Sequence, residues 1–234
     1  MNLRKFLLSL IVLAALIAAG AAYFLPSLIE SRISSEVQEK INADAVQVNI
    51  VSSPQYMLLL GKVDELDISA GDVKLGDTAL SALDVQGRNL DISLEDLLLA
   101  RRLVISSADQ LTVRGTLSEQ ALTRLLNEKV DGVSDITAQI RPEGIDATGR
   151  IALFGRYADL HIRAKVFIEG SQLMLRITDI DTSGGVFGRI GVSFTKDIPL
   201  ADTSSLPVEN AQFTKAEQQN GQVLIEAAVN PVQQ

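Results

Sequence analysis

The chain has 234 residues but no cysteine, no tryptophan and a single histidine. The absence of cysteine excludes a disulfide framework and any thiolate metal site. With His161 as the sole imidazole, a zinc site built from several histidines is excluded too, and a serine–histidine–acid triad would have to use this residue. No Gly-x-Ser-x-Gly elbow, Walker loop or dinucleotide fingerprint occurs. We therefore predict no catalytic residue, no metal and no cofactor.

The titratable residues that remain are best interpreted as surface groups. His161 lies in the alternating run ADLHIRAKVFIEG, where it shares one strand face with Asp159 and Arg163, and we expect that face to be exposed. Asp179 and Asp181 also share a strand face, which would suit an acid–base pair or a Ca²⁺ ion, but no calcium-loop spacing surrounds them. Two solvated acids on an exposed sheet are the simpler interpretation.

Negative charge dominates the chain. The net charge is −8, and Arg4 and Lys5 are the only charged side chains among the first 25 residues, so residues 26–234 carry −8 − 2 = −10. An acidic surface repels phosphate backbones, so we predict no nucleic-acid partner. The same charge argues against electrostatic docking on anionic lipid. Contact with a membrane would have to come from apolar segments.

One apolar segment is long enough to be a membrane anchor. Phe6 to Leu25 form a run of 20 residues without a charge, which at 1.5 Å per residue spans roughly the 30 Å hydrocarbon core of a bilayer. The positive flank before this run predicts a cytoplasmic amino terminus and an extracytoplasmic location for residues 26–234. The alternative is a signal peptide cleaved near Gly20–Ala22, in which case the rest is secreted. The run exceeds the usual h-region, which favours an anchor retained in the cell membrane.

Residues 26–234 are predicted to form one exported α+β domain. Apolar spacings of three and four predict a helix over 26–42, and from residue 45 the apolar period changes to two, as in half-buried strands. After Gly132 the pattern is almost entirely that of an antiparallel meander, and Asn220-Gly221 predicts a hairpin near the end. Three segments that begin with Ser and are rich in Leu predict further helices, at 53–60, 93–99 and 118–130.

These Leu-rich segments are the remaining unusual signal. Those at 56–60 and 97–99 are hydrophobic nearly all round, so they are either buried on several sides or face an apolar ligand or membrane. Ordinary core packing is one interpretation, and a lining for acyl chains is the other. The predicted lining consists of Leu58, Leu59, Leu60, Leu97, Leu98, Leu99, Leu122, Leu125 and Leu126.

Four segments of the chain carry a family resemblance: SPQYMLLLGKVDELDISAGDVKLGDTALSALDVQGRNLDISLEDLLLARRLVI (53–105), LTVRGTLSEQALTRLLNEKV (111–130), GRYADLHIRAKVFIEGSQLMLRITDIDTSGGVFGR (155–189) and Leu206-Pro207. The order of elements in them resembles that of the bacterial LmeA-like phospholipid-binding proteins. The resemblance implies an exported, membrane-associated domain that binds phospholipid in an apolar groove. The implied architecture is similar to the tubular lipid-binding group, with a long curved antiparallel sheet wrapped against a few helices. It implies no active-site residues.

Three functions follow as hypotheses. The leading one is a membrane-tethered envelope protein that binds phospholipid or glycolipid tails, for transport or presentation, without breaking a covalent bond. The alternative is an acidic scaffold or interaction ectodomain of an envelope assembly, with the Leu-rich helices as plain core. An enzyme that uses the Asp179 and Asp181 pair is the third, and the shortage of histidine, cysteine and tryptophan argues against it.

Overall fold

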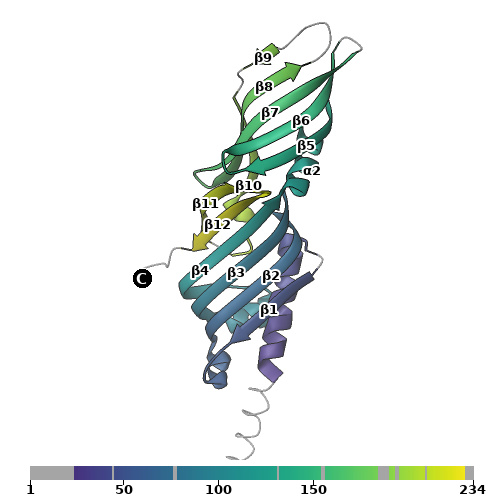
Figure 1. Ribbon diagram of the computed structural model, residues 1–234. Coiled ribbons are helices and arrows are strands. Elements are labelled where there is room, and N and C mark those ends of the chain that lie inside the picture. Colours follow the sequence, from purple (N-terminus) through teal and green to yellow (C-terminus); the bar gives the residue numbers. More distant parts are fainter. Residues whose placement is uncertain are drawn as a thin grey trace, which may run out of the picture.

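The computed structural model of the chain describes residues 24–43, 45–75, 78–130, 132–153, 156–183, 190–192, 195–208 and 210–229. These residues form two antiparallel β-sheets that lie end to end in an elongated body, with a long helix beside the lower sheet (Figure 1).

The lower sheet has six strands in the order β1-β2-β3-β4-β12-β11 (Figure 1). The first four pair antiparallel in chain order, whereas β12 pairs with β4 and brings the end of the chain back into the sheet. Its strands are β1 (Ala45–Val51), β2 (Lys62–Leu75), β3 (Thr78–Ile92), β4 (Ile105–Ser118), β11 (Ala211–Gln219) and β12 (Gln222–Val229).

The upper sheet has the order β10-β8-β7-β6-β5, with the short strand β9 also paired to β8. Strands β5 to β8 form an antiparallel meander, and β10 returns to the outer edge of β8. Its strands are β5 (Val133–Arg141), β6 (Gly144–Leu153), β7 (Arg156–Glu169), β8 (Gln172–Ser183), β9 (Ile190–Val192) and β10 (Lys196–Asp202).

The first helix, residues 24–41, packs against the lower sheet with one apolar stripe. Its buried side chains recur at spacings of three and four, which places them on one face; they are Ile29, Ile33, Val37 and Ile41. Two polar contacts fix its direction against β1. The Ser34 hydroxyl donates to the Val46 carbonyl at 3.0 Å, and the Glu30 carboxylate accepts from the Ile50 backbone N–H at 3.3 Å. The start of the helix therefore lies beside the end of β1.

Two one-turn helices lie at the same end of the lower sheet. A 3₁₀ turn, η1 (Gln55–Leu60), joins β1 to β2, and a π-type turn, η2 (Asp96–Ala100), follows β3. Gly61 ends η1 in the left-handed region at φ 76, and its carbonyl accepts from the Ile92 N–H at 2.8 Å. That bond ties η1 to the end of β3, and η2 begins four residues further on.

The helix α2 (Glu119–Lys129) lies between the sheets. Ser118 caps it, because its hydroxyl accepts from the Ala121 N–H at 3.3 Å. Side chains of α2 accept from the backbone of β5: the Glu119 carboxylate from the Ile140 N–H at 2.8 Å and the Thr123 hydroxyl from the Ala138 N–H at 3.0 Å. The helix thereby joins β4 of one sheet to β5 of the other.

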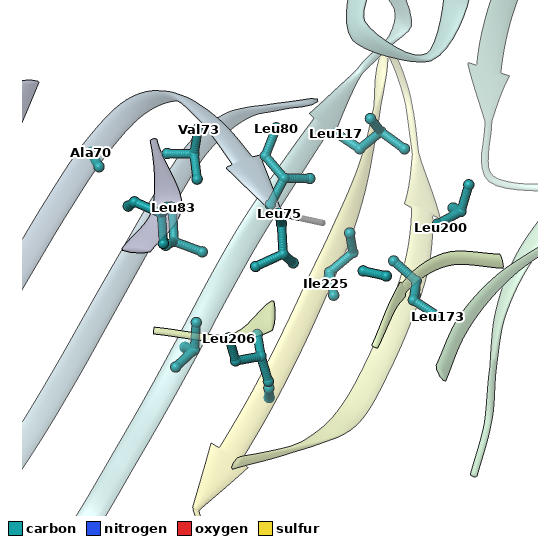
Figure 2. Close-up of a cluster of buried hydrophobic side chains, with 14 of the residues drawn as sticks. Ala70, Val73, Leu75, Leu80, Leu83, Leu117, Leu173, Leu200, Leu206 and Ile225 are labelled. Atoms are coloured by element: carbon teal, nitrogen blue, oxygen red, sulfur yellow. The ribbon is translucent and has the colours of Figure 1, made fainter. Parts of the chain in front are cut away.

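One aliphatic core runs through both sheets. Figure 2 shows a cluster of buried side chains from β2, β3, β4 and β12 of the lower sheet together with Leu173 of β8 and Leu200 of β10. Thr78 is the only buried polar or charged residue among those described, and its hydroxyl donates to the Leu200 carbonyl at 2.6 Å. The hydrogen bond links β3 to β10, so the sheets are joined by polar as well as apolar contacts.

The structure agrees with the expected α+β class and corrects its detail. The helices predicted at 26–42, 53–60, 93–99 and 118–130 are confirmed and correspond to the first helix, η1, the segment 94–100 that contains η2, and α2. The meander and the Asn220-Gly221 hairpin are confirmed too. Two sheets replace the single long sheet that was expected. Among the described residues, no helix is both long and apolar enough to cross a bilayer. All of the predicted anchor except Phe24 and Leu25 lies outside the described residues.

Candidate functional site

A hollow of about 740 Å³ opens at mid-body, where the first helix ends and the sheets meet. Four segments line it: the end of the first helix, the turn between β7 and β8, the one-turn helix η3 (Thr203–Ser205), and the chain from η3 into β11. The lining residues are Lys40, Gly170, Ser171, Thr203, Ser204, Leu206, Val208, Asn210, Ala211 and Gln212. Among the described lining residues, the polar side chains carry hydroxyls, amides and one ammonium, and they stand beside the apolar Leu206, Val208 and Ala211.

Asp202 holds two sides of this hollow together. Its carboxylate accepts from the Ser204 backbone N–H at 2.9 Å and from the Ser171 hydroxyl at 3.2 Å. The hydrogen bond from the Ser204 N–H is the main reason that the pKa of Asp202 lies below its usual range. A further bond joins the Thr203 N–H to the Ser171 carbonyl at 3.0 Å. Together they fix η3 against the β7–β8 turn.

Lys40 contributes a cationic side chain to the lining of the hollow. Its ammonium lies 3.5 Å from the Pro207 carbonyl oxygen, at the outer limit of a hydrogen bond, and its side chain is exposed. An ammonium beside several hydroxyls suits an anionic ligand such as a phosphate group.

A smaller cleft of about 130 Å³, lined by polar and apolar side chains together, adjoins the hollow. The two share Val208 and Asn210, so the segment after η3 forms a wall of both. The rest of the cleft comes from β4, the residues before it and the end of β12; its apolar lining is Leu103, Val104, Ile105, Ala108, Leu111, Pro207, Val208 and Val229. The hollow has a lysine and several hydroxyls, and the cleft adds an aliphatic wall, so the two together could accommodate an amphiphile.

The nine leucines of the predicted lining separate into two groups. Five are at most 5% exposed and belong to the continuous core: Leu58, Leu97, Leu122, Leu125 and Leu126. The other four project from η1 and η2 at the far end of the lower sheet: Leu59, Leu60, Leu98 and Leu99. None of the nine lines the mid-body hollow or the cleft beside it. Their contact with acyl chains stays a prediction.

The polar candidates lie on the outer face of the upper sheet. His161, Asp159 and Arg163 are exposed, as the alternation predicted. The Arg163 guanidinium lies 3.6 Å from Asp179 and 3.8 Å from Asp181, so one cation is shared by both carboxylates. In the described part of the chain, no three acidic or imidazole side chains gather as a metal site would require.

The mid-body hollow was not found from the sequence. Lys40, Ser171 and Ser204 are far apart in the chain. Pairing of β8 with β10 brings Ser171 and Ser204 together, and the packing of the first helix against the lower sheet adds Lys40. The one local signal was the stretch 182–207, which is rich in Gly, Ser and Pro and showed no regular pattern. Segments of this composition form the loops that often carry function.

Comparison with known families gives one match. The family model described as LmeA-like phospholipid-binding matches residues 20–228, which is most of the chain. No curated protein and no solved structure gives a significant match.

Proposed function

The chain belongs to the LmeA-like phospholipid-binding family, and from this premise we propose that it is a non-enzymatic, membrane-tethered protein of the cell envelope that holds one phospholipid or glycolipid at mid-body. The lipid's phosphate lies in the hollow beside Lys40, and an acyl chain enters the cleft along β4. Residues 26–234 act outside the cytoplasm. The ligand is carried or presented without chemical change.

The pairing of the two cavities is the observation that supports this proposal. A phospholipid needs a polar site and an apolar site in direct contact, and Val208 and Asn210 border both. The hollow, at about 740 Å³, falls within the ~300–1,000 Å³ that ligand sites usually occupy. The cleft, at about 130 Å³, is far below that range. An acyl chain therefore enters only when Pro207 and Val208 move away from β4.

The hydrophobic effect supplies the affinity. Each CH₂ group transferred out of water contributes about 0.8 kcal/mol, so part of one acyl chain is enough for stable binding. Lys40 sets the orientation of the lipid and adds a smaller electrostatic contribution to the affinity, because Lys40 is exposed and water screens its charge.

Native mass spectrometry of the full chain, released from detergent micelles, tests the proposal. We expect discrete adducts of phospholipid mass that organic extraction removes. Val208→Glu places a carboxylate between hollow and cleft and should abolish the adduct. Lys40→Glu should weaken it by roughly tenfold, which corresponds to about 1.4 kcal/mol.

Lys196→Glu is the matched control for the charge reversal. Lys196 is an exposed lysine of β10 that lines neither cavity, so its variant should retain the adduct. A protein that carries no lipid after incubation with liposomes, and self-associates with rising concentration, would favour the scaffold function instead. An adduct that survives in Val208→Glu would place the lipid elsewhere.

A further inference from the structure

Exposed hydrophobic side chains are concentrated at one end of the molecule. Of the nine large ones among the described residues, all but Tyr157 lie at the end of the lower sheet where the first helix begins. Five of them form a surface that we call the apolar tip: Tyr56, Leu59 and Leu60 of η1 with Leu98 and Leu99 of η2. Soluble proteins rarely gather exposed apolar side chains in this way without a binding partner.

The degree of exposure shows that these side chains are not loosely packed core. Leu60 is 71% exposed and Leu99 is 79% exposed. Within the same two turns, Leu58 and Leu97 are at most 2% exposed. Each turn thus buries one leucine as an anchor and presents its neighbours outward.

The two turns are held together by main-chain hydrogen bonds and a cap. The Ile92 N–H donates to the Gly61 carbonyl at 2.8 Å, which fixes η1 to the strand that leads into η2. Ser93 begins that second turn, and its hydroxyl lies 2.6 Å from the Asp96 carboxylate. The pKa of Asp96 is lowered, chiefly by this hydroxyl. These contacts hold the exposed side chains of the tip in a defined arrangement.

The chain's membrane-length apolar run ends at this same surface. Residues 6–25 contain no charge, and Phe24 and Leu28, at the start of the first helix, are 63% and 57% exposed. Glu30 contacts the N–H of Ile50 near the end of β1, and η1 follows four residues after that strand. Figure 1 shows the start of this helix and the turn after β1 at the same end of the body.

We propose that the apolar tip inserts into the lipid leaflet beside the tether, as a second membrane contact. The occupant is a bilayer surface, because the tip projects where the 20-residue apolar run enters the domain. Charges of both signs surround it, with Lys62 and Arg102 each paired to an aspartate. Insertion is thus driven by apolar area and should proceed on zwitterionic vesicles without any need for anionic lipid. The proposal rests on the tether but not on the mid-body lipid site.

Single cysteines test the insertion cleanly, because the chain has none of its own. The full chain is reconstituted into phosphatidylcholine vesicles with an environment-sensitive dye at Leu60→Cys or Leu99→Cys. Tyr157→Cys is the matched control, since Tyr157 is 69% exposed and lies at the β6–β7 end of the upper sheet. Ala15→Cys reports the tether itself. Lipids with nitroxide groups on their acyl chains quench dyes that reach the leaflet.

We expect the dyes at 60 and 99 to be quenched at least about twofold more than the dye at 157, since interfacial elements bury roughly 5–10 Å into the headgroup and acyl boundary. Quenching at 15 with none at 60 and 99 overturns the tip contact but leaves the tether standing. Quenching nowhere overturns both. Energy transfer between copies labelled at 60, without lipid quenching, would show that a second copy covers the tip and would also overturn the proposal.

Discussion

Gly61 offers the sharpest test of how the tip is built. Its φ of 76 lies in the left-handed region, and a Cβ added there would meet the carbonyl group of Ile92 well inside contact distance. An L-residue in this region costs about 1–2 kcal/mol. The clash forces the backbone apart and removes the hydrogen bond from the Ile92 N–H to the Gly61 carbonyl, a further loss of about 1 kcal/mol. We expect Gly61→Ala to lower the free energy of unfolding by about 2–3 kcal/mol.

Gly170→Ala is the matched control, because it introduces the backbone strain of a positive φ without a steric clash. Gly170 has φ 60, but nothing lies within 4 Å of the position that its Cβ would take, so only the backbone strain of about 1–2 kcal/mol remains. Urea unfolding followed by far-UV circular dichroism measures both variants, because the chain has no tryptophan to report by fluorescence. Equal losses for the two variants would show that Ile92 yields freely and would refute the reasoning.

Three further predictions concern the core, the joint between the sheets and pH. Leu122→Ala, at a fully buried position of α2, should cost about 2–5 kcal/mol in urea unfolding, whereas Leu99→Ala at the exposed tip should stay within about 0.5 kcal/mol; similar costs would contradict the division into core and tip. Thr78→Val removes the hydrogen bond to the Leu200 carbonyl and should cost about 1–3 kcal/mol by the same assay, and a neutral result would mean that this bond does not help to join the sheets. The pKa of Asp202 is lowered from 3.8 in the folded chain, so its stabilising effect is complete above that value and is lost as the pH falls through the folded-state pKa. The thermal unfolding temperature should therefore decline in acid, and the decline should be smaller for Asp202→Asn; parallel curves would exclude a role for this carboxylate.

Local patterns in the sequence predicted the elements well wherever one residue fixes the geometry. Ser118 begins α2 as a cap, and Asn220-Gly221 forms the turn of the β11–β12 hairpin. Alternation of apolar and polar residues predicts two separate strand segments, 63–70 and 72–76, on either side of Gly71, whereas the structure has one continuous strand, β2. Asp72 does adopt a positive φ of 48, but pairing with β3 continues on both sides of it. Cross-strand pairing thus overrode a local turn signal.

Local patterns did not predict which leucines of the Leu-rich turns are buried and which are exposed. A run such as YMLLL is apolar on every side, so its periodicity carries no information about which leucine is buried. Only the attachment of η1 to the end of β3 directs Leu58 inward and Leu60 outward. The mid-body hollow could not be predicted from local patterns at all, because it depends on how the two sheets and the first helix pack together.

The distance between the tip and the mid-body hollow constrains how the protein can use a lipid. From Phe24 to Lys40 the first helix has 16 steps, which at 1.5 Å per residue amount to about 24 Å. Half of the hydrocarbon core of a bilayer is only about 15 Å thick. If the tip lies in the leaflet, a phospholipid with its phosphate beside Lys40 cannot keep its tails in that leaflet. The proposed site and the proposed tip are therefore compatible only with complete extraction of the lipid, in which the cleft along β4 replaces the bilayer as the apolar environment. A protein that merely presented a membrane-embedded lipid would need its polar site near η1 and η2, whereas the hollow beside Lys40 lies at mid-body.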